Sequence, residues 1–380
     1  MTTSWVRSPH AVRMAWAAWG LLFLIMAGIV LSGGDRTVTG NYWQAGASWL
    51  SGRPLYAETG HGFIYLPQAA IAFAPFSVLP PVIAGVLWRL LTVGAYAYGV
   101  RHLARLGEDH TGIALFPLMT ALCLPLASDS ARNGQATLLV TAMMILAVID
   151  LADQRWTRAA VWLCVGVAIK PLGTFLLLLA AVLYKPVRGR LLATMACVAV
   201  VPFLMQRPDY VISQYRAWAT MVTIGAHVGS AQDWAQLFGL LSIAGLHVSA
   251  VVQTAMRAAA AVLTLGVCLF AARRQTAAQA AVSLFVLHAC FLMLFSPRTE
   301  NNTYAVLAPG IAVLCAQAWL IEGRRLAGVA LAALAIITAG GYELGRRILP
   351  ASPPTWLAPL MTVCFAVYAV GRVWRARESE

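Results

Sequence analysis

The chain has 380 residues, of which 60% are hydrophobic and only 11% are charged, with a net charge of +13 and a mean hydropathy of +0.74. Soluble globular proteins carry about 25% charged residues, so this chain could not cover a water-facing surface. The composition therefore excludes a set of soluble domains and indicates a polytopic helical membrane protein. At about 20 apolar residues per span, the length allows roughly ten to thirteen spans.

The basic balance has an explanation within this class, because basic residues gather in the short cytoplasmic loops of membrane proteins. The net charge therefore does not point to a nucleic-acid partner. Only two of the 27 basic residues are lysines, Lys170 and Lys185. The seven cysteines all lie in apolar runs without a CxxC pair, so they predict neither disulfides nor a zinc site.

The first apolar run, about 14–31, follows Arg7 and Arg13. Because more apolar runs follow, it predicts an uncleaved first helix with a cytoplasmic N-terminus rather than a signal peptide. Later basic clusters alternate with polar connections, which predicts about twelve spans, both termini in the cytoplasm, and one integral membrane domain over 1–380. The predicted outer connections are 33–63, 128–135, about 206–247, 297–303 and 342–354.

In the first outer connection, Tyr42, Ala45, Trp49 and Leu50 fall at helical spacing. This predicts a short amphipathic helix on the membrane surface. Asp35 lies at the outer mouth of the first span and is the candidate catalytic residue of this connection, although a solvated loop acid is the alternative.

Two apolar runs do not fit a single span. The run 64–79 is short and contains several prolines, which favours a half-inserted or interfacial helix. The stretch 159–184 is too long for one span and is interrupted at Lys170-Pro171, so we expect two short helices that meet near the outer side. A broken helix leaves backbone groups free only where they line a cavity, and an anion-binding Lys170 therefore fits better than a lysine that extends to the interface.

Two further polar clusters lie in outer connections, the turn 129–135 and the hairpin 295–304. Polar side chains in a membrane protein are costly, so their clustering indicates a site. Arg89, Arg257 and His288 lie within spans and receive no role. The candidate ligands of an anion are Arg132, Lys170 and Arg298, and the candidate substrate contacts are Tyr42, His61, Tyr65, Asn133, Gln135, Glu300, Asn301, Asn302 and Tyr304.

The sequence contains no Walker loop, no GxGxxG, no HExxH and no GxSxG, so cytoplasmic nucleotide binding is unsupported. An outer site with a carboxylate and several cations suggests a donor that reaches it through the membrane, such as a polyprenyl-phosphate sugar. A carboxylate would take the proton of the acceptor hydroxyl, and fixed positive charge would stabilise the departing phosphate.

A series of motifs from about Asp35 to Pro309 resembles glycosyltransferase family 87. The resemblance implies the C-type glycosyltransferase fold, a polyprenyl-phosphate-linked sugar donor, often mannose, and inversion with an aspartate of the first outer loop, here Asp35, as base. It further implies a lipid or glycan acceptor and an active site on the outer face of the inner membrane. A divalent cation remains open as a cofactor, since no residue spacing requires one. The motifs are Tyr42-Trp43-Gln44-Ala45-Gly46, Leu50-Ser51-Gly52-Arg53-Pro54-Leu55-Tyr56, Phe63-Ile64-Tyr65-Leu66-Pro67, Pro75, Gly134-Gln135, Ala168-Ile169-Lys170-Pro171 and Ser296-Pro297.

The sequence departs from the family pattern in two places. The family's aspartate stands about four residues before the loop tyrosine, where this chain has Val38. Either the loop is about three residues longer here and Asp35 is the base, or the base lies elsewhere, with Glu300 and Asp129 as the alternatives. The hairpin 297–304 lacks the tryptophan and histidines that many members of the family carry at this place. This difference suggests a subgroup with a different acceptor or donor sugar. A secondary transporter or lipid flippase, or a non-catalytic scaffold of a cell-envelope complex, remain the other hypotheses.

Overall fold

The structure is a computed structural model that describes residues 9–34, 37–56, 62–108, 112–225, 234–348 and 354–375, and every regular element within these ranges is helical. Eight helical segments in them are long and apolar enough to cross a membrane. Three shorter apolar helices accompany them: α7 (Thr137–Ala152), α8 (Trp156–Ile169) and Pro171–Leu183, which contains α9 (Thr174–Leu183). The eight are α2 (Pro9–Leu31), α5 (Pro81–Gly107), Lys185–Met205 with α10 (Arg188–Met205), α13 (Ala250–Arg274), α14 (Ala277–Phe295), Asn301–Ile321, α16 (Arg325–Ile348) and α17 (Leu357–Arg375).

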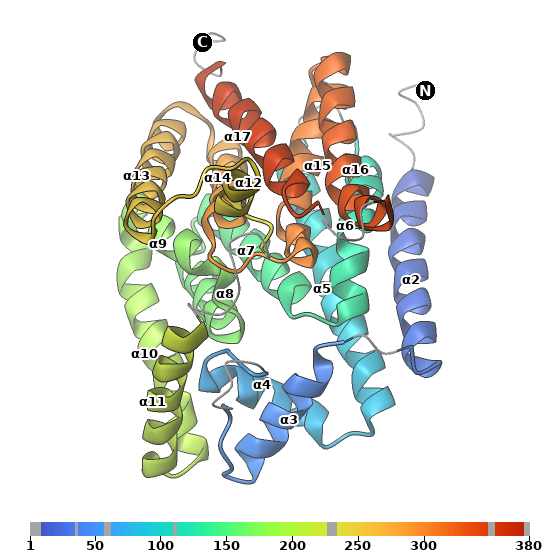
Figure 1. Ribbon diagram of the computed structural model, residues 1–380. Helices are drawn as coiled ribbons and strands as arrows, with labels where there is room; N and C mark the ends of the chain where they lie inside the picture. Colours follow the sequence, from blue (N-terminus) through green and yellow to red (C-terminus); the bar gives the residue numbers. More distant parts are fainter. Residues whose placement is uncertain are drawn as a thin grey trace.

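The helices thus define a multi-pass membrane protein. The count of twelve spans and the C-type glycosyltransferase fold remain predictions. The N-terminal end of α2 and the C-terminal end of α17 lie at the same end of the molecule (Figure 1). Helices α3 (Thr39–Leu50), α4 (Pro67–Ser77) and α11 (Pro208–Gly225) lie at the opposite end (Figure 1).

The interior is built from α5, α6 (Phe116–Asn133), α7, α14 and α15 (Ala308–Ala316), which pack against one another. All residues of α15 are buried. By contrast, α10 buries only Leu191 and Pro202, and α13 only Cys268 and Ala271. An apolar helix that packs little of its surface against the rest of the protein is suited to lipid contact. Helices α10 and α13 therefore form part of the lateral surface of the helix bundle.

The predicted short helix of the first outer connection is confirmed as α3. Its residues Tyr42, Ala45 and Trp49 are buried, whereas Leu50 is 52% exposed and does not belong to the packed face. The Tyr42 ring stacks on Phe73 of α4 with 4.3 Å between ring centroids. Helix α4 begins with Pro67 at its first turn, where the missing N–H costs nothing.

Gly46 lets α3 and α4 approach closely, because a Cβ at this position would lie 2.9 Å from the Cα of Ala74. We expect Gly46→Ala to destabilise the protein by about 1–3 kcal/mol, since overpacking forces the two backbones apart. Thermal unfolding of the purified protein measures this loss. The control is Gly40→Ala on the same helix, where a Cβ meets nothing within 4 Å; equal unfolding temperatures for the two variants would contradict the packing argument.

The predicted break in the stretch 159–184 is also confirmed. Helix α8 ends at Ile169, Lys170 is extended with φ −154° and ψ 121°, and a short 3-10 turn from Pro171 to Gly173 leads into α9. Pro171 supplies no backbone N–H and disfavours helical geometry at the residue before it, which accounts for the extended Lys170.

The predicted outer connection of about 206–247 contains two helices, α11 and α12 (Leu237–Ile243). Helix α11 is bound to the first outer connection. The Tyr210 hydroxyl donates to the Arg53 carbonyl oxygen at 2.7 Å, and the Leu55 amide donates to Gln214 Oε1 at 2.9 Å. Helix α11 of the second predicted outer connection therefore packs against the first.

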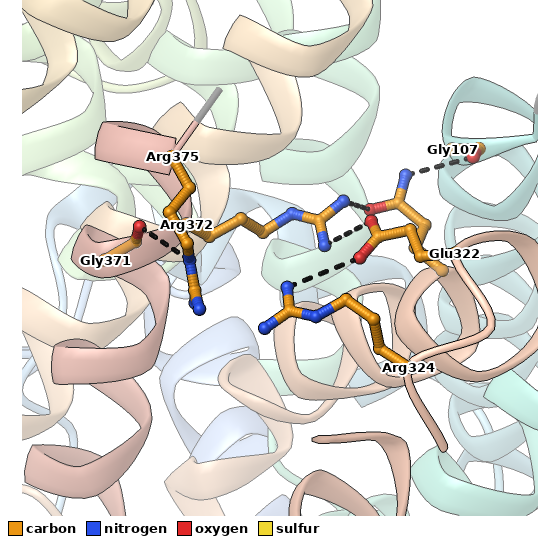
Figure 2. A network of polar contacts seen from close by, with 7 residues as sticks. Gly107, Glu322, Arg324, Gly371, Arg372 and Arg375 are labelled. Atoms are coloured by element: carbon orange, nitrogen blue, oxygen red, sulfur yellow. Dashed lines mark hydrogen bonds and ion pairs between the residues drawn. The ribbon is translucent and has the colours of Figure 1, made fainter. Parts of the chain in front are cut away.

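An ionic network lies at the other end of the molecule, near the C-terminal end of α17. Arg324 and Arg372 both point toward Glu322, at the end of η5 (Gln317–Ile321) (Figure 2). Gln317 accepts a hydrogen bond from Arg372 and donates one to the Gly107 carbonyl, each at 3.0 Å. These contacts tie α17 and η5 to the end of α5.

Candidate active site

The turn between α6 and α7 organises the site. Gly134 adopts the left-handed region with φ +64°, which ends α6 and is the usual role of glycine after a helix. The Asn133 carbonyl accepts hydrogen bonds from the Val38 amide at 3.0 Å and the Thr37 hydroxyl at 2.9 Å. The Trp88 indole donates to the Gly134 carbonyl at 2.7 Å. The start of α3 is thereby fixed against the turn.

Gly134 is also a point of close approach, because a Cβ there would lie 2.5 Å from Thr39 Cγ2 and 2.8 Å from Thr37 Oγ1. We expect Gly134→Ala to lower the unfolding temperature and to lower activity, since it adds a clash to the cost of about 1–2 kcal/mol for a left-handed alanine. The control is Gly52→Ala, where φ is +66° and nothing lies within 4 Å of the added Cβ. A loss no greater than that of the control would show that the turn tolerates a side chain.

A chain of polar side chains runs from the helix break to the hairpin before α15. Lys170 Nζ donates to Gln135 Oε1 at 3.0 Å and to Thr137 Oγ1 at 2.8 Å. Gln135 Nε2 in turn donates to Glu300 Oε2 at 2.8 Å. The neutral amide of Gln135 thus connects a cation to a carboxylate, and each of the three groups comes from a different segment.

These groups line a cavity of about 210 Å³, which we call the lysine cavity. The Arg298 guanidinium lies 4.9 Å from the centre of the Trp234 ring, within cation–π range. The polar side chains that line the lysine cavity include those of Tyr42, Tyr65, Gln135, Lys170, Arg298 and Glu300.

Two tyrosines form one wall of the lysine cavity. The Tyr42 and Tyr65 hydroxyls lie 3.4 Å apart, and the Ala136 amide donates to the Tyr42 hydroxyl at 3.3 Å. Burial raises the pKa of Tyr42 to about 12, although the hydrogen bond with Tyr65 opposes the shift, and burial raises the pKa of Tyr65 well above its usual value. Both residues therefore remain neutral phenols that can donate hydrogen bonds to a ligand.

A second cavity, of about 370 Å³, lies between α6, α16 and the hairpin, and we call it the asparagine cavity. Glu300 lines both cavities. Arg346 is held by Glu343 at 2.8 Å. The lining side chains are Asp129, Arg132, Asn133, Glu300, Asn301, Asn302, Tyr342, Glu343, Arg346 and Thr355.

The structure thus brings ten of the thirteen predicted site residues to these two cavities. The grouping of Arg132 with Lys170 and Arg298 needs correction, because Arg132 lines the asparagine cavity and the other two line the lysine cavity. Tyr304 is a second correction: it is fully buried and donates to the Ala235 carbonyl at 3.0 Å, so it is a core residue. Asp35 and His61 lie outside the described residues.

Sequence reasoning missed several residues around the two cavities. Buried Arg89 of α5 donates hydrogen bonds to the Arg132 carbonyl at 3.0 Å and to the Gly85 carbonyl at 3.1 Å, so it connects α5 to the α6–α7 turn. Tyr342 and Glu343 also line a cavity. They lie in the predicted outer connection 342–354, and this position is the one sequence feature that could have indicated them as site residues. As for metals, no group of three or more His, Cys, Asp or Glu residues that could hold an ion occurs in the described ranges.

The apolar helices define a multi-pass membrane protein that contains the two cavities with polar linings. The profile of glycosyltransferase family 87 matches residues 63–297, more than half of the chain. The chain therefore belongs to glycosyltransferase family 87 and is a membrane glycosyltransferase, which confirms the family predicted from the motifs. The matched region includes Gln135 and Lys170, and it begins after Tyr42 and ends before Arg298. No curated protein matches the chain significantly.

Proposed function

We propose that the protein transfers a sugar from a polyprenyl-phosphate donor to an acceptor hydroxyl on the outer face of the inner membrane, with inversion at the anomeric carbon. The observation that carries this proposal is the Lys170–Gln135–Glu300 chain in the lysine cavity. Among the described residues that line it, two cations, Lys170 and Arg298, face one carboxylate, so the cavity suits a phosphate.

The chemistry requires charge stabilisation where the phosphate departs. When the sugar–phosphate bond breaks, its electron pair stays on the phosphate oxygen, and Lys170 and Arg298 are positioned to stabilise that charge. Fixed cations in a low-dielectric site are effective because they need no reorganisation during the reaction. The neutral hydroxyls of Tyr42 and Tyr65 offer further hydrogen bonds to the donor.

An apolar pocket of about 280 Å³, some of whose lining residues adjoin those of the lysine cavity along the chain, supports a prenyl donor. It is lined mainly by apolar residues of α8, α9 and α10, among them Val167, Leu177 and Phe203, and Gln68 and Tyr215 complete the lining. Its residues Leu66 and Ala168 directly adjoin Tyr65 and Ile169–Lys170 in the chain. A ligand with a phosphate head and a hydrocarbon chain has complementary surroundings in the two spaces.

The proposed base is Asp35, as the family resemblance implies, with Glu300 as the alternative. Asp35 directly precedes Arg36 and Thr37 in the chain, and the Thr37 hydroxyl is bonded to the α6–α7 turn. Glu300 lines the lysine cavity itself. Either carboxylate would accept the proton of the attacking hydroxyl, a contribution of roughly 10²–10⁴ in rate.

The test is incubation of the purified full-length protein with a panel of polyprenyl-phosphate sugars and membrane extract as the source of acceptor. Mass analysis should show free polyprenyl phosphate and a glycosylated product in equal amounts. Movement of the intact donor across proteoliposome membranes without a covalent product would instead identify a flippase and overturn the proposal.

A further inference from the structure

The asparagine cavity is separate from the lysine cavity but shares one side chain with it. Glu300 lines both, and the Gln135 amide that binds Glu300 lies on the lysine side. The α6–α7 turn forms part of the boundary, since Asn133 faces one cavity and Gln135 the other. Two ligands bound in the two cavities would therefore meet beside Glu300.

The two cavities differ in charge. In the part of the chain that the structure describes, two cations and one carboxylate line the lysine cavity, whereas two arginines and three carboxylates, Asp129, Glu300 and Glu343, line the asparagine cavity. Arg346 is paired with Glu343 at 2.8 Å, so its charge is largely compensated within α16. The asparagine cavity is therefore unsuited to a phosphate and suited to a neutral ligand.

Its side chains also indicate the chemistry of that ligand. Three amides, from Asn133, Asn301 and Asn302, both donate and accept hydrogen bonds, while the carboxylates only accept. Tyr342 adds an aromatic ring to the wall. Hydrogen-bond donors and acceptors together with an aromatic ring match a molecule with many hydroxyls and an apolar face, as a saccharide has.

We infer that the asparagine cavity is the acceptor site and that it binds a saccharide whose attacking hydroxyl projects past Glu300 into the lysine cavity. This inference rests on the proposed function. In the transfer, the acceptor O–H bond breaks and its proton passes to a carboxylate. The acceptor oxygen bonds to the anomeric carbon, and the sugar–phosphate bond breaks with its electron pair on the departing polyprenyl phosphate.

The experiment measures binding of two soluble probes to the purified full-length protein, namely a panel of methyl hexopyranosides with their disaccharides, and inorganic phosphate. We expect Asn301→Ala and Tyr342→Ala each to weaken saccharide binding about 10-fold, the loss of roughly one hydrogen bond or ring contact, while phosphate binding stays unchanged. Arg298→Gln should have the opposite pattern. Arg347→Gln is the control, since this exposed residue follows Arg346 and lines neither cavity.

Saccharide binding that is lost in Arg298→Gln but retained in Asn301→Ala and Tyr342→Ala would overturn the inference, as would the absence of millimolar binding by any saccharide of the panel. Only variants that keep the wild-type unfolding temperature are compared, which excludes misfolding as the cause of a loss of binding. A third outcome separates this inference from the proposed function: saccharides bind in the expected pattern, but no polyprenyl-phosphate sugar is turned over. In that case the proposed function is wrong, and so is the role of the asparagine cavity as an acceptor site. The assignment of a saccharide as the ligand of this cavity would still stand.

Discussion

Lys170→Gln should lower kcat/KM for the polyprenyl-phosphate donor by roughly 10²–10³-fold, the usual loss when one preorganised group that stabilises transition-state charge is removed. Lys170 Nζ holds Gln135 and Thr137 at 3.0 and 2.8 Å and lines the lysine cavity. Glutamine keeps hydrogen-bonding capacity but removes the charge that faces the phosphate. The rate of release of polyprenyl phosphate at several donor concentrations measures the effect.

The chain contains its own matched control, because its only other lysine is Lys185, an exposed residue between α9 and α10. Lys185→Gln should leave donor turnover unchanged. Lys170→Arg should recover part of the activity, since it restores the charge but not the geometry of the lysine. Equal losses in the glutamine and arginine variants, together with a lowered unfolding temperature, would reduce Lys170 to a structural residue.

The parts of the fold that the sequence predicts best depend on local backbone rules. Proline constrains its own φ and the residue before it, so the break at Lys170-Pro171 and the short helix after Leu66 were visible without tertiary information. The helix of the first outer connection followed from the spacing of Tyr42, Ala45 and Trp49. Leu50 shares that spacing but is exposed, because the packed face is set by where α4 lies.

The composition of each cavity depended on tertiary packing and could not be predicted. Arg132 and Gln135 are three residues apart, yet they line different cavities because the chain reverses at the left-handed Gly134 between them. A turn at Asn133-Gly134 is a local signal, but the directions of its flanking side chains depend on α3 and Trp88.

The hairpin before α15 gives a second example. Asn301 and Asn302 face the asparagine cavity, whereas Tyr304, in the same 3-10 segment η4 (Asn301–Val306), turns into the core to reach Ala235. Tyr342 and Glu343 join the cavity from α16 because that helix packs against α6. Polarity alone identified the segment, but burial decided which of its residues can touch a ligand.

The largest loss is expected from Asp35→Asn, which should lower transfer by roughly 10²–10⁴-fold if Asp35 is the base, since asparagine cannot accept the proton of the acceptor hydroxyl. Glu300→Gln should then have a smaller effect, because glutamine can still accept the hydrogen bond from Gln135 Nε2. Asp209→Asn, at an exposed acid of α11, is the control and should behave as the wild type.

The pH profile of kcat/KM separates a base from a residue that only positions the substrate. A carboxylate base is active when deprotonated, so wild-type activity should fall as the pH decreases, and this acidic limb should vanish in the variant that lacks the base. If Glu300→Gln strongly lowers the activity and its residual activity lacks the limb, while Asp35→Asn retains both, then the base is Glu300. In that case the attack occurs at the residue shared by the two cavities, and the proton acceptor of this chain lies in the hairpin before α15 rather than in the first outer loop.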